Sequence, residues 1–282
     1  AKTDYQFDTP VTAWDENEKT AHWRNRPEGM PFFSIFNIMT SHESRLWVKK
    51  NDPVTIRAED VEVPPYYPDV PVVRKDIARV HSNNTIMDRE VGEIIQQLKD
   101  DGLYNETIIV FYSDHGGPLP RQKREIYDSG LHVPFIIRFP KNKFAGKKVD
   151  ELISFVDVPP TMLSLAGIEP PEYMHGQAFW GEYKAETPRE YVFAARDRVD
   201  YQYDIRRAVR DKQFKYIRNY RPEVPCYQDV KFRKNIDMMK EMLRMRDEGL
   251  LNEEQMYWFR ETKEPEELYD ITKDPHELNN LA

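Results

Sequence analysis

The sequence contains very little cysteine, no long apolar stretch and no surplus of basic residues. Cys226 is the single cysteine in 282 residues, which excludes an intrachain disulfide framework and a zinc site built from several cysteines. A lone cysteine is most often a small core or surface residue without a special role. No apolar run approaches the length of a membrane span, and the residues after Ala1 contain no hydrophobic signal core. The net charge of −8 argues against a nucleic-acid partner.

The remaining composition describes a folded globular chain. Hydrophobic residues make up 39% and aromatic residues 12% of the sequence, which is too much for a disordered tail. The length suits one large domain, or a large and a small one, with a sizeable core. The acidic balance still permits a polyanionic ligand, because a few local cations can outweigh a distant acidic surface.

The first two thirds of the chain alternate between apolar runs and helical patterns. Residues 32–39, 107–112 and 133–139 are short, β-prone runs typical of buried strands. Apolar residues follow a helical spacing from Ile77 to Leu98, and the glycine that follows is a good stop signal. Because a long helix that leads into a strand is half of a βαβ unit, the pattern predicts an α/β architecture with a largely parallel sheet.

The pattern changes near Pro188, where we place a boundary between residues 1–188 and a smaller C-terminal part, residues 189–282. A charged, Met-rich helix is expected over residues 229–248. Closely spaced strands are expected over residues 191–195, 206–210 and 214–218. The last two strands are separated by a short turn and should form an antiparallel hairpin.

The clearest chemistry follows the strand at residues 107–112. In open α/β sheets, ligands bind beyond the carboxyl ends of the strands, and this strand ends in Asp114 and His115, followed by two glycines. Aspartate and histidine are ordinary ligands of a divalent cation. A purely structural alternative is that Asp114 caps a turn and His115 is a loop residue, because the dipeptide alone is not specific.

The surroundings of this pair resemble a signature of the sulfatase family, which belongs to the alkaline-phosphatase-like superfamily. The family pattern is an Asp-Asn/His-Gly turn, a downstream Lys or Arg, and Gly-x-x-x-Pro at the entry to a strand. Here it is matched by residues 112–118, Lys123 and residues 130–134. Further features agree in order over almost the whole chain, namely His42 after an apolar run, residues 157–167, His175-Gly176, and the ending at residues 267–281.

The resemblance implies a fold as well as a site. It implies an α/β sandwich with a large, mostly parallel mixed sheet, of which the N-terminal strands are missing here. It also implies that residues 189–282 form a small α+β subdomain with an antiparallel sheet, which borders the substrate pocket.

By resemblance, Asp114 and His115 match one pair of metal ligands. The family usually binds calcium there and often has Asn where this chain has His115. Because calcium prefers oxygen ligands, manganese and magnesium stay open as alternatives.

By the same resemblance, Lys123 matches the cation that contacts a sulfate oxygen and the ester oxygen of the leaving group. S–O cleavage builds negative charge on the departing oxygen, which a fixed ammonium stabilises. His42 matches the histidine that touches the sulfate and can protonate the same oxygen as a general acid. Arg121 and Arg124 compete for the role of Lys123, since three cations lie within four positions.

A basic and aromatic segment in the C-terminal part is a candidate for substrate contact. Arginine suits sulfate and carboxylate groups, and aromatic faces suit sugar rings. The alternative is a solvated hairpin with alternating charges. The candidate residues are Arg196, Asp197, Arg198, Tyr203 and Arg206.

Two parts of the family's active site are missing from this chain. Sulfatases attack with formylglycine, made from Cys or Ser in a Cys/Ser-x-Pro/Ala-x-Arg motif, and Cys226 does not lie in such a motif. The Asp-Asp pair that supplies the other metal carboxylates is also absent. We therefore expect these residues alone to be inactive and poorly stable, with an exposed sheet edge. The resemblance implies a periplasmic or secreted protein.

The function expected for the intact protein is hydrolysis of a sulfate ester, or a sulfamate, on a sulfated carbohydrate, since the C-terminal part resembles bacterial polysaccharide and heparan N-sulfatase-like enzymes. One alternative is a phosphonate monoester or phosphodiester hydrolase of the same superfamily, where an Asp-His pair and manganese are at home. Another is a non-catalytic carbohydrate-binding relative. The sequence upstream of Ala1 would separate enzyme from non-enzyme, because only an enzyme needs the formylglycine motif.

Overall fold

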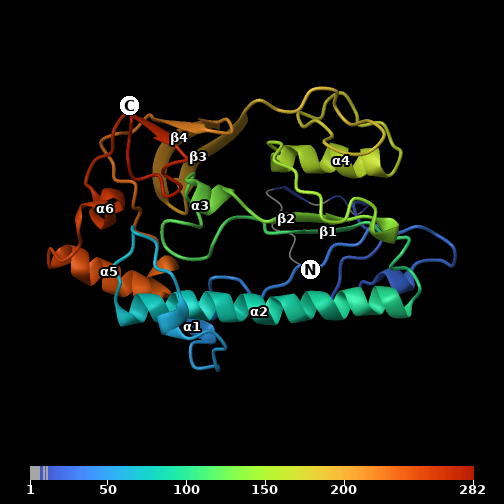
Figure 1. Ribbon diagram of the computed structural model, residues 1–282, viewed down its shortest axis with the longest axis horizontal. Coiled ribbons are helices and arrows are strands. Elements are labelled where there is room, and N and C mark those ends of the chain that lie inside the picture. Colours follow the sequence, from blue (N-terminus) through green and yellow to red (C-terminus); the bar gives the residue numbers. More distant parts are fainter. Residues whose placement is uncertain (1–6, 9, 11) are drawn as a thin grey trace.

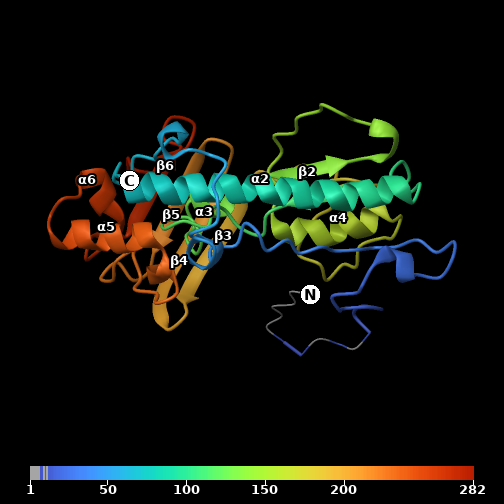
Figure 2. The ribbon, with the colours of Figure 1, turned by 90° about the horizontal axis from the view of Figure 1, so that it is seen from below.

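A computed structural model describes residues 7, 8, 10 and 12–282 of the chain. Its helices and strands are, in chain order, the 3-10 helix η1 (Trp23–Asn25), α1 (Arg45–Val48), η2 (Ala58–Asp60), α2 (Pro71–Asp100), β1 (Ile109–Tyr112), α3 (Asp128–Leu131), β2 (Phe135–Arg138), η3 (Pro140–Asn142), η4 (Phe155–Asp157), α4 (Val158–Leu165), β3 (Val192–Val199), β4 (Gln202–Arg210), β5 (Phe214–Asn219), η5 (Arg233–Asn235), α5 (Asp237–Asp247), α6 (Glu253–Met256), η6 (Tyr257–Phe259) and β6 (Glu266–Asp270). Two lobes lie side by side, and α2 runs along both of them (Figures 1 and 2). One lobe holds β1, β2 and α4; the other holds β3 to β6 with α5 and α6.

Helix α2 is the longest element, and the apolar spacing predicted it correctly. It begins with Pro71, whose fixed φ suits the first turn and whose missing N–H leaves no hydrogen bond unmade there. It ends where the N–H groups of Gly102 and Leu103 donate to carbonyls of the last turn, with Gly102 at a φ of +71°, which glycine adopts without strain. Among the described residues, no helix combines the length and the apolar character that a bilayer crossing needs.

The larger hydrophobic core lies between the first half of α2 and α5. Val73 and Ile77 of α2 belong to it together with Met238 and Met239 of α5. Since these residues come from both sides of position 188, the predicted boundary marks a change in secondary structure and does not separate two cores. The division into residues 1–188 and 189–282 as domains stays a prediction.

Strands β1 and β2 form a two-stranded sheet with α2 on one face and α4 on the other (Figure 1). Both strands and the α/β class were predicted correctly. However, the two strands are antiparallel, with Ile109 opposite Arg138, and every strand pair among the described residues is antiparallel. The reason is the connection: the chain leaves β1 and returns beside it through a loop, without the crossover that a parallel pair needs. The described residues therefore do not form the expected large parallel sheet.

Residues 32–39 were predicted to form a buried strand, and this prediction is wrong. The segment has no regular secondary structure and pairs with no strand of the described chain. Phe33 and Ile35 are 64% and 49% exposed, whereas Phe32 and Phe36 pack against the ring of Trp23. A strand needs a hydrogen-bonding neighbour as well as apolar side chains, and an apolar run does not reveal whether a neighbour is present.

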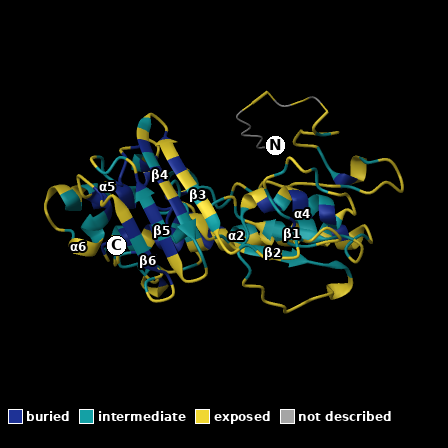
Figure 3. Cartoon of the chain, turned by 90° about the horizontal axis from the view of Figure 1, so that it is seen from above, coloured by how far each residue is buried: buried dark blue, intermediate teal, exposed yellow. Residues whose placement is uncertain are grey.

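The second sheet has the strand order β3-β4-β5-β6, and all its pairs are antiparallel. The predicted hairpin of β4 and β5 is confirmed, with Ala208 opposite Ile217. Buried and exposed residues alternate along these strands (Figure 3), as expected of a sheet with one covered face. The predicted helix at 229–248 is shorter than expected, because Ile236 is in extended conformation and α5 begins after it.

Candidate active site

The loop between β1 and β2 carries the predicted metal pair and the predicted catalytic lysine. Gly116 N donates to Gly130 O at 2.8 Å, and Gly117 N donates to Ser129 O at 3.2 Å. A Cβ on Gly116 would lie 2.0 Å from Ser129 O, so only glycine permits this approach. Lys123 N donates to Gly117 O at 3.0 Å. The backbone thus holds Lys123 and the turn of the predicted metal pair in one folded unit.

Lys123 lies beside a buried carboxylate that sequence reasoning did not single out. The Glu43 side chain is 1% exposed, and its Oε1 is 3.3 Å from Lys123 Nζ. Arg124 donates to both oxygens of the same carboxylate, at 3.0 and 2.5 Å. Burial alone would raise the pKa of Glu43, but Arg124 and Lys123 outweigh it and hold the pKa below its ordinary value. Glu43 is therefore an ionised carboxylate shared by two cations.

Of the three neighbouring cations, Arg121 is closed to a ligand. It is 1% exposed, and its guanidinium lies between the rings of Tyr66 and Tyr127, 4.3 and 4.4 Å from their centroids. It also donates to two backbone carbonyls near the C-terminus. Lys123 and Arg124 are 17% and 18% exposed, so these two can reach an anion.

His42 directly precedes Glu43, so one turn presents both the imidazole and the buried carboxylate. Its Nδ1 accepts a hydrogen bond from Ser44 N at 3.2 Å and lies 2.9 Å from Ser44 Oγ, which fixes the orientation of the ring. The ring of Phe232 lies 6.3 Å from that of His42, and its centroid is 5.9 Å from the guanidinium carbon of Arg124. Three segments distant in sequence therefore meet at this point.

Asp114 and His115 offer one carboxylate and one imidazole from the same turn. Their side chains are 65% and 30% exposed, with His115 Nε2 3.7 Å from Asp114 Oδ1. His115 Nδ1 lies 2.7 Å from the carbonyl oxygen of Gly116, the kind of contact that orients a metal-binding histidine. Over the described part of the chain, no group of three or more His, Cys, Asp or Glu could hold a metal ion. The pair fits a divalent cation as part of a site.

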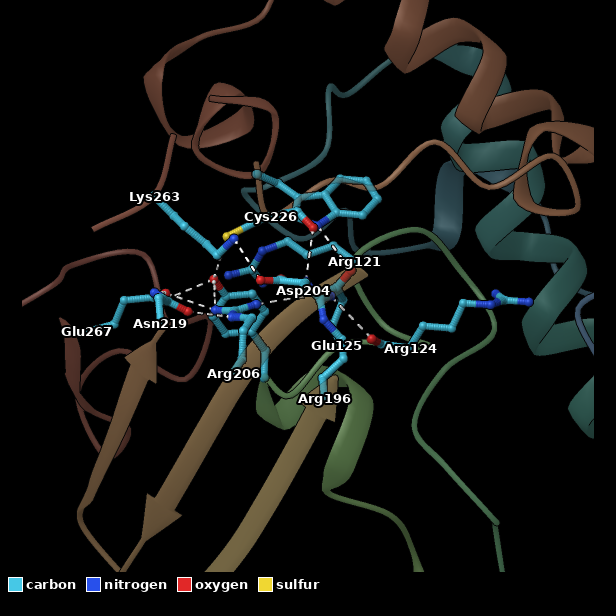
Figure 4. A network of polar contacts seen from close by, with 12 residues as sticks. Arg121, Arg124, Glu125, Arg196, Asp204, Arg206, Asn219, Cys226, Lys263 and Glu267 are labelled. Atoms are coloured by element: carbon cyan, nitrogen blue, oxygen red, sulfur yellow. Dashed lines mark hydrogen bonds and ion pairs between the residues drawn. The ribbon is translucent and has the colours of Figure 1, made fainter. Parts of the chain in front are cut away.

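Arg196 and Arg206, which were predicted to contact substrate, lie inside a buried network of charges (Figure 4). They are 6% and 0% exposed. Arg196 pairs with Glu125 and with Asp204, the latter at 2.7 Å, and Arg206 pairs with Glu267 at 2.8 Å. Breaking a buried pair costs about 3–5 kcal/mol. We therefore assign both arginines a structural role. The sequence did not reveal this burial, because Glu125 and Glu267 come from segments distant from the hairpin in the chain.

The other three predicted substrate residues, Asp197, Arg198 and Tyr203, lie on the exposed end of the β3–β4 hairpin. Arg198 and Tyr203 face each other across the two strands, and Tyr203 is 54% exposed. Asp197 pairs with a neighbouring arginine at 2.6 Å. Because Arg196 donates to the backbone carbonyl of Arg124, the hairpin is joined to the loop that carries Lys123. Contact of these three residues with substrate stays a prediction.

Two residues of the cluster escaped sequence reasoning. Glu43 follows a histidine in no recognisable pattern, and its partners lie about eighty positions away. Phe232 lies in an irregular segment and is 41% exposed. The lone Cys226 is 2% exposed, and burial raises the pKa of its thiol. Of the two alternatives that the sequence left open, it is therefore a core residue, and it is a poor nucleophile.

The chain matches two protein-family models. Residues 17–168 match the family model described as Sulfatase, which covers more than half of the chain. Residues 121–248 match the model described as N-sulphoglucosamine sulphohydrolase, C-terminal. The first match contains His42, the metal pair and Lys123.

The curated relatives that the chain matches are longer than the chain itself. It is 48% identical, over 316 aligned residues, to an ulvan-active sulfatase of Formosa agariphila, covering 100% of this chain and 53% of that protein. It is 29% identical, over 238 residues, to N-sulphoglucosamine sulphohydrolase of Homo sapiens, covering 79% of this chain and 47% of that protein. The chain spans about half the length of these relatives.

Solved structures show the same fold. A Bacteroides thetaiotaomicron chain, reported with that organism's metabolism of multiple glycosaminoglycans, has a TM-score of 0.54 at 22% identity and covers 91% of this chain and 48% of its own. A 2-O GAG sulfatase has a TM-score of 0.53 at 21% identity and covers 91% of this chain and 49% of its own. This likeness confirms the predicted alkaline-phosphatase-like fold class.

Proposed function

Because this chain belongs to the sulfatase family, we propose that it supplies one half of an active site that hydrolyses a sulfate ester or a sulfamate on a sulfated carbohydrate. The observation that carries the proposal is the cluster around Glu43. There the turn of His42, the loop of Lys123 and Arg124, and the Asp114-His115 turn are tied together by ion pairs and backbone hydrogen bonds.

In this proposal Lys123 and His42 act on the leaving group. When the S–O bond breaks, negative charge develops on the departing oxygen, and the ammonium of Lys123 stabilises it. The imidazole of His42 donates a proton to the same atom, so the sugar leaves as a neutral alcohol. For a sulfamate, an S–N bond breaks and the departing nitrogen takes the proton.

Two further components complete the proposed site. Asp114 and His115 would hold a divalent cation with ligands from elsewhere, and that ion would supply positive charge near the sulfate. Calcium is the first candidate. Because calcium prefers oxygen ligands and His115 offers a nitrogen, manganese and magnesium are alternatives. The nucleophile would be a formylglycine outside these 282 residues, since Cys226 is buried and has no formylglycine motif around it.

The names of the relatives support the substrate class. One is an ulvan-active sulfatase and another an N-sulphoglucosamine sulphohydrolase. Exposed Asp197, Arg198 and Tyr203 would contact the sugar beside the sulfate. A periplasmic or secreted location is part of the proposal and rests on the family resemblance.

The test uses the intact protein, with the polypeptide that precedes Ala1. We expect turnover of 4-nitrophenyl sulfate and of a sulfated glycan panel that includes ulvan and N-sulfoglucosamine. Lys123→Ala should lower kcat roughly 100-fold, and a chelator should abolish turnover until a divalent cation is returned. Strong turnover of an aryl phosphonate with little sulfatase turnover would establish the phosphonate alternative. An upstream sequence without a formylglycine motif would point to a non-catalytic carbohydrate-binding protein.

A further inference from the structure

Glu43, which follows His42, joins the turn of that histidine to the loop of Lys123 and Arg124. Its side chain is 1% exposed, and its Oε1 accepts from Arg124 at 2.5 Å while lying 3.3 Å from Lys123 Nζ. The backbone places it immediately after His42. A movement of this carboxylate would therefore shift both the ammonium and the imidazole.

The charges of this group do not cancel. One carboxylate faces two cations, so Glu43, Lys123 and Arg124 together carry one net positive charge. The buried pair of Asp157 and Arg189 is different: there one arginine holds one carboxylate through two hydrogen bonds of 2.7 and 2.5 Å, and the charges balance. A surplus positive charge at a partly exposed site attracts an anion, and a sulfate ester carries one negative charge.

The backbone around Arg124 is strained in a way that favours this arrangement. Arg124 has a φ of +75°, a conformation that costs a non-glycine residue energy and that recurs at functional sites. The strained turn directs the side chains of Lys123 and Arg124 to the same carboxylate. An ordinary ion pair with Glu43 would need only one of these two cations.

We propose that Glu43 is a positioning residue, which sets the ammonium of Lys123 against the departing oxygen and leaves one unit of positive charge for the sulfate. This rests on the proposed function. Glu43 does not itself touch the reacting atoms. Its removal should therefore act through Lys123, and most strongly where the departing oxygen depends on that ammonium.

The experiment compares leaving groups in the intact enzyme. The phenoxide that leaves phenyl sulfate is a less stable anion than the 4-nitrophenoxide that leaves 4-nitrophenyl sulfate, so cleavage of phenyl sulfate depends more on Lys123. For Glu43→Gln we expect kcat to fall roughly 100-fold on phenyl sulfate and roughly tenfold on 4-nitrophenyl sulfate, which shifts the ratio of the two rates about tenfold. Glu43→Asp keeps the negative charge, so its ratio of the two rates should lie between that of Glu43→Gln and that of the wild-type enzyme. Asp157→Asn removes a buried carboxylate that pairs with Arg189 instead. It controls for general loss of stability and should leave the ratio unchanged.

The outcomes separate this proposal from the proposed function. If wild-type enzyme hydrolyses neither the aryl sulfates nor the sulfated glycans, the proposed function fails and this role falls with it. If wild-type enzyme is active and Glu43→Gln lowers both rates by the same factor, or neither, the positioning role alone is overturned. Thermal melting shows whether each variant folds. Should Glu43→Gln not fold, Glu43→Asp decides, because its carboxylate is drawn back by one methylene: a shifted ratio supports the role and an unchanged ratio refutes it.

Discussion

Asp76 shows how a single carboxylate can link two helices at a cost that depends on pH. It lies on the buried face of α2, is 6% exposed, and accepts a hydrogen bond from Met238 N in the first turn of α5 at 2.7 Å. Burial raises the pKa of Asp76 to about 6, although the bond from Met238 acts in the opposite direction. The folded protein therefore binds this proton more tightly than the unfolded chain does.

The sign of the resulting pH dependence follows from linkage. A carboxyl with a raised pKa stabilises the fold fully below its unfolded pKa, near 4, and this contribution is lost as pH rises through about 6. We therefore compare the change in the free energy of unfolding on Asp76→Asn at two pH values. We predict that this change is more favourable to the fold at pH 7.5 than at pH 4, by roughly 1–3 kcal/mol. Urea unfolding at both pH values measures this, with exposed Asp247→Asn as the control. An effect of Asp76→Asn that does not change with pH would contradict it.

At the residue scale, sequence could predict chemical types but not their surroundings. Asp114, His115, Lys123 and His42 were found because their order along the chain resembles a family pattern. Glu43 was missed, because a buried ion pair with a partner 81 positions away leaves no local pattern. Arg206 was predicted to contact substrate because arginine suits sulfate, and its burial was not foreseen because its carboxylate partner lies 61 positions away.

The loop between β1 and β2 is the element on which the site depends, and close backbone contacts hold it. Gly116 is packed so tightly against Ser129 O that a side chain there meets backbone, which cannot rotate away. Gly92, in α2, has nothing within 4 Å of the same position and adopts no positive φ. The two glycines can therefore be compared directly: packing requires glycine at position 116, whereas position 92 has room for a side chain.

We predict that the two alanine substitutions act in opposite directions. Gly116→Ala should destabilise the protein by roughly 1–3 kcal/mol, because the added methyl overpacks the loop. Gly92→Ala should stabilise it by about 0.5–1 kcal/mol, since alanine loses less conformational freedom in a helix. Midpoints of urea unfolding compare the two. Equal shifts for both variants would mean that the loop can open to admit the methyl group.

At the element scale, helices were predicted better than sheets. The signals for α2 are local: an apolar spacing, a proline at its start and a glycine after its end. The pairing of strands depends on which neighbour is present, and no local pattern specifies that. The run at 32–39 has the composition of a core strand, yet it pairs with no strand among the described residues.

At the scale of the whole molecule, apolar side chains remain in contact with solvent on the lobe of β1 and β2. Neither strand has a fully buried residue, and each pairs only with the other within the described chain. Ile136 is 59% exposed, and Phe33 is 64% exposed. Such edges and faces favour association. In longer relatives, about half of the protein has no counterpart in this chain.

We predict that these 282 residues alone bind a hydrophobic dye such as ANS and associate as their concentration rises. Ile136→Thr with Phe33→Ser should reduce both effects, because the double substitution removes apolar surface from this lobe. Leu250→Ser is the matched control: Leu250 is 55% exposed but follows α5 in the other lobe, so its substitution should change little. Dye fluorescence and light scattering across a concentration series measure the two effects. A monomeric chain without dye binding would show that this face is stable in water and needs no further polypeptide to cover it.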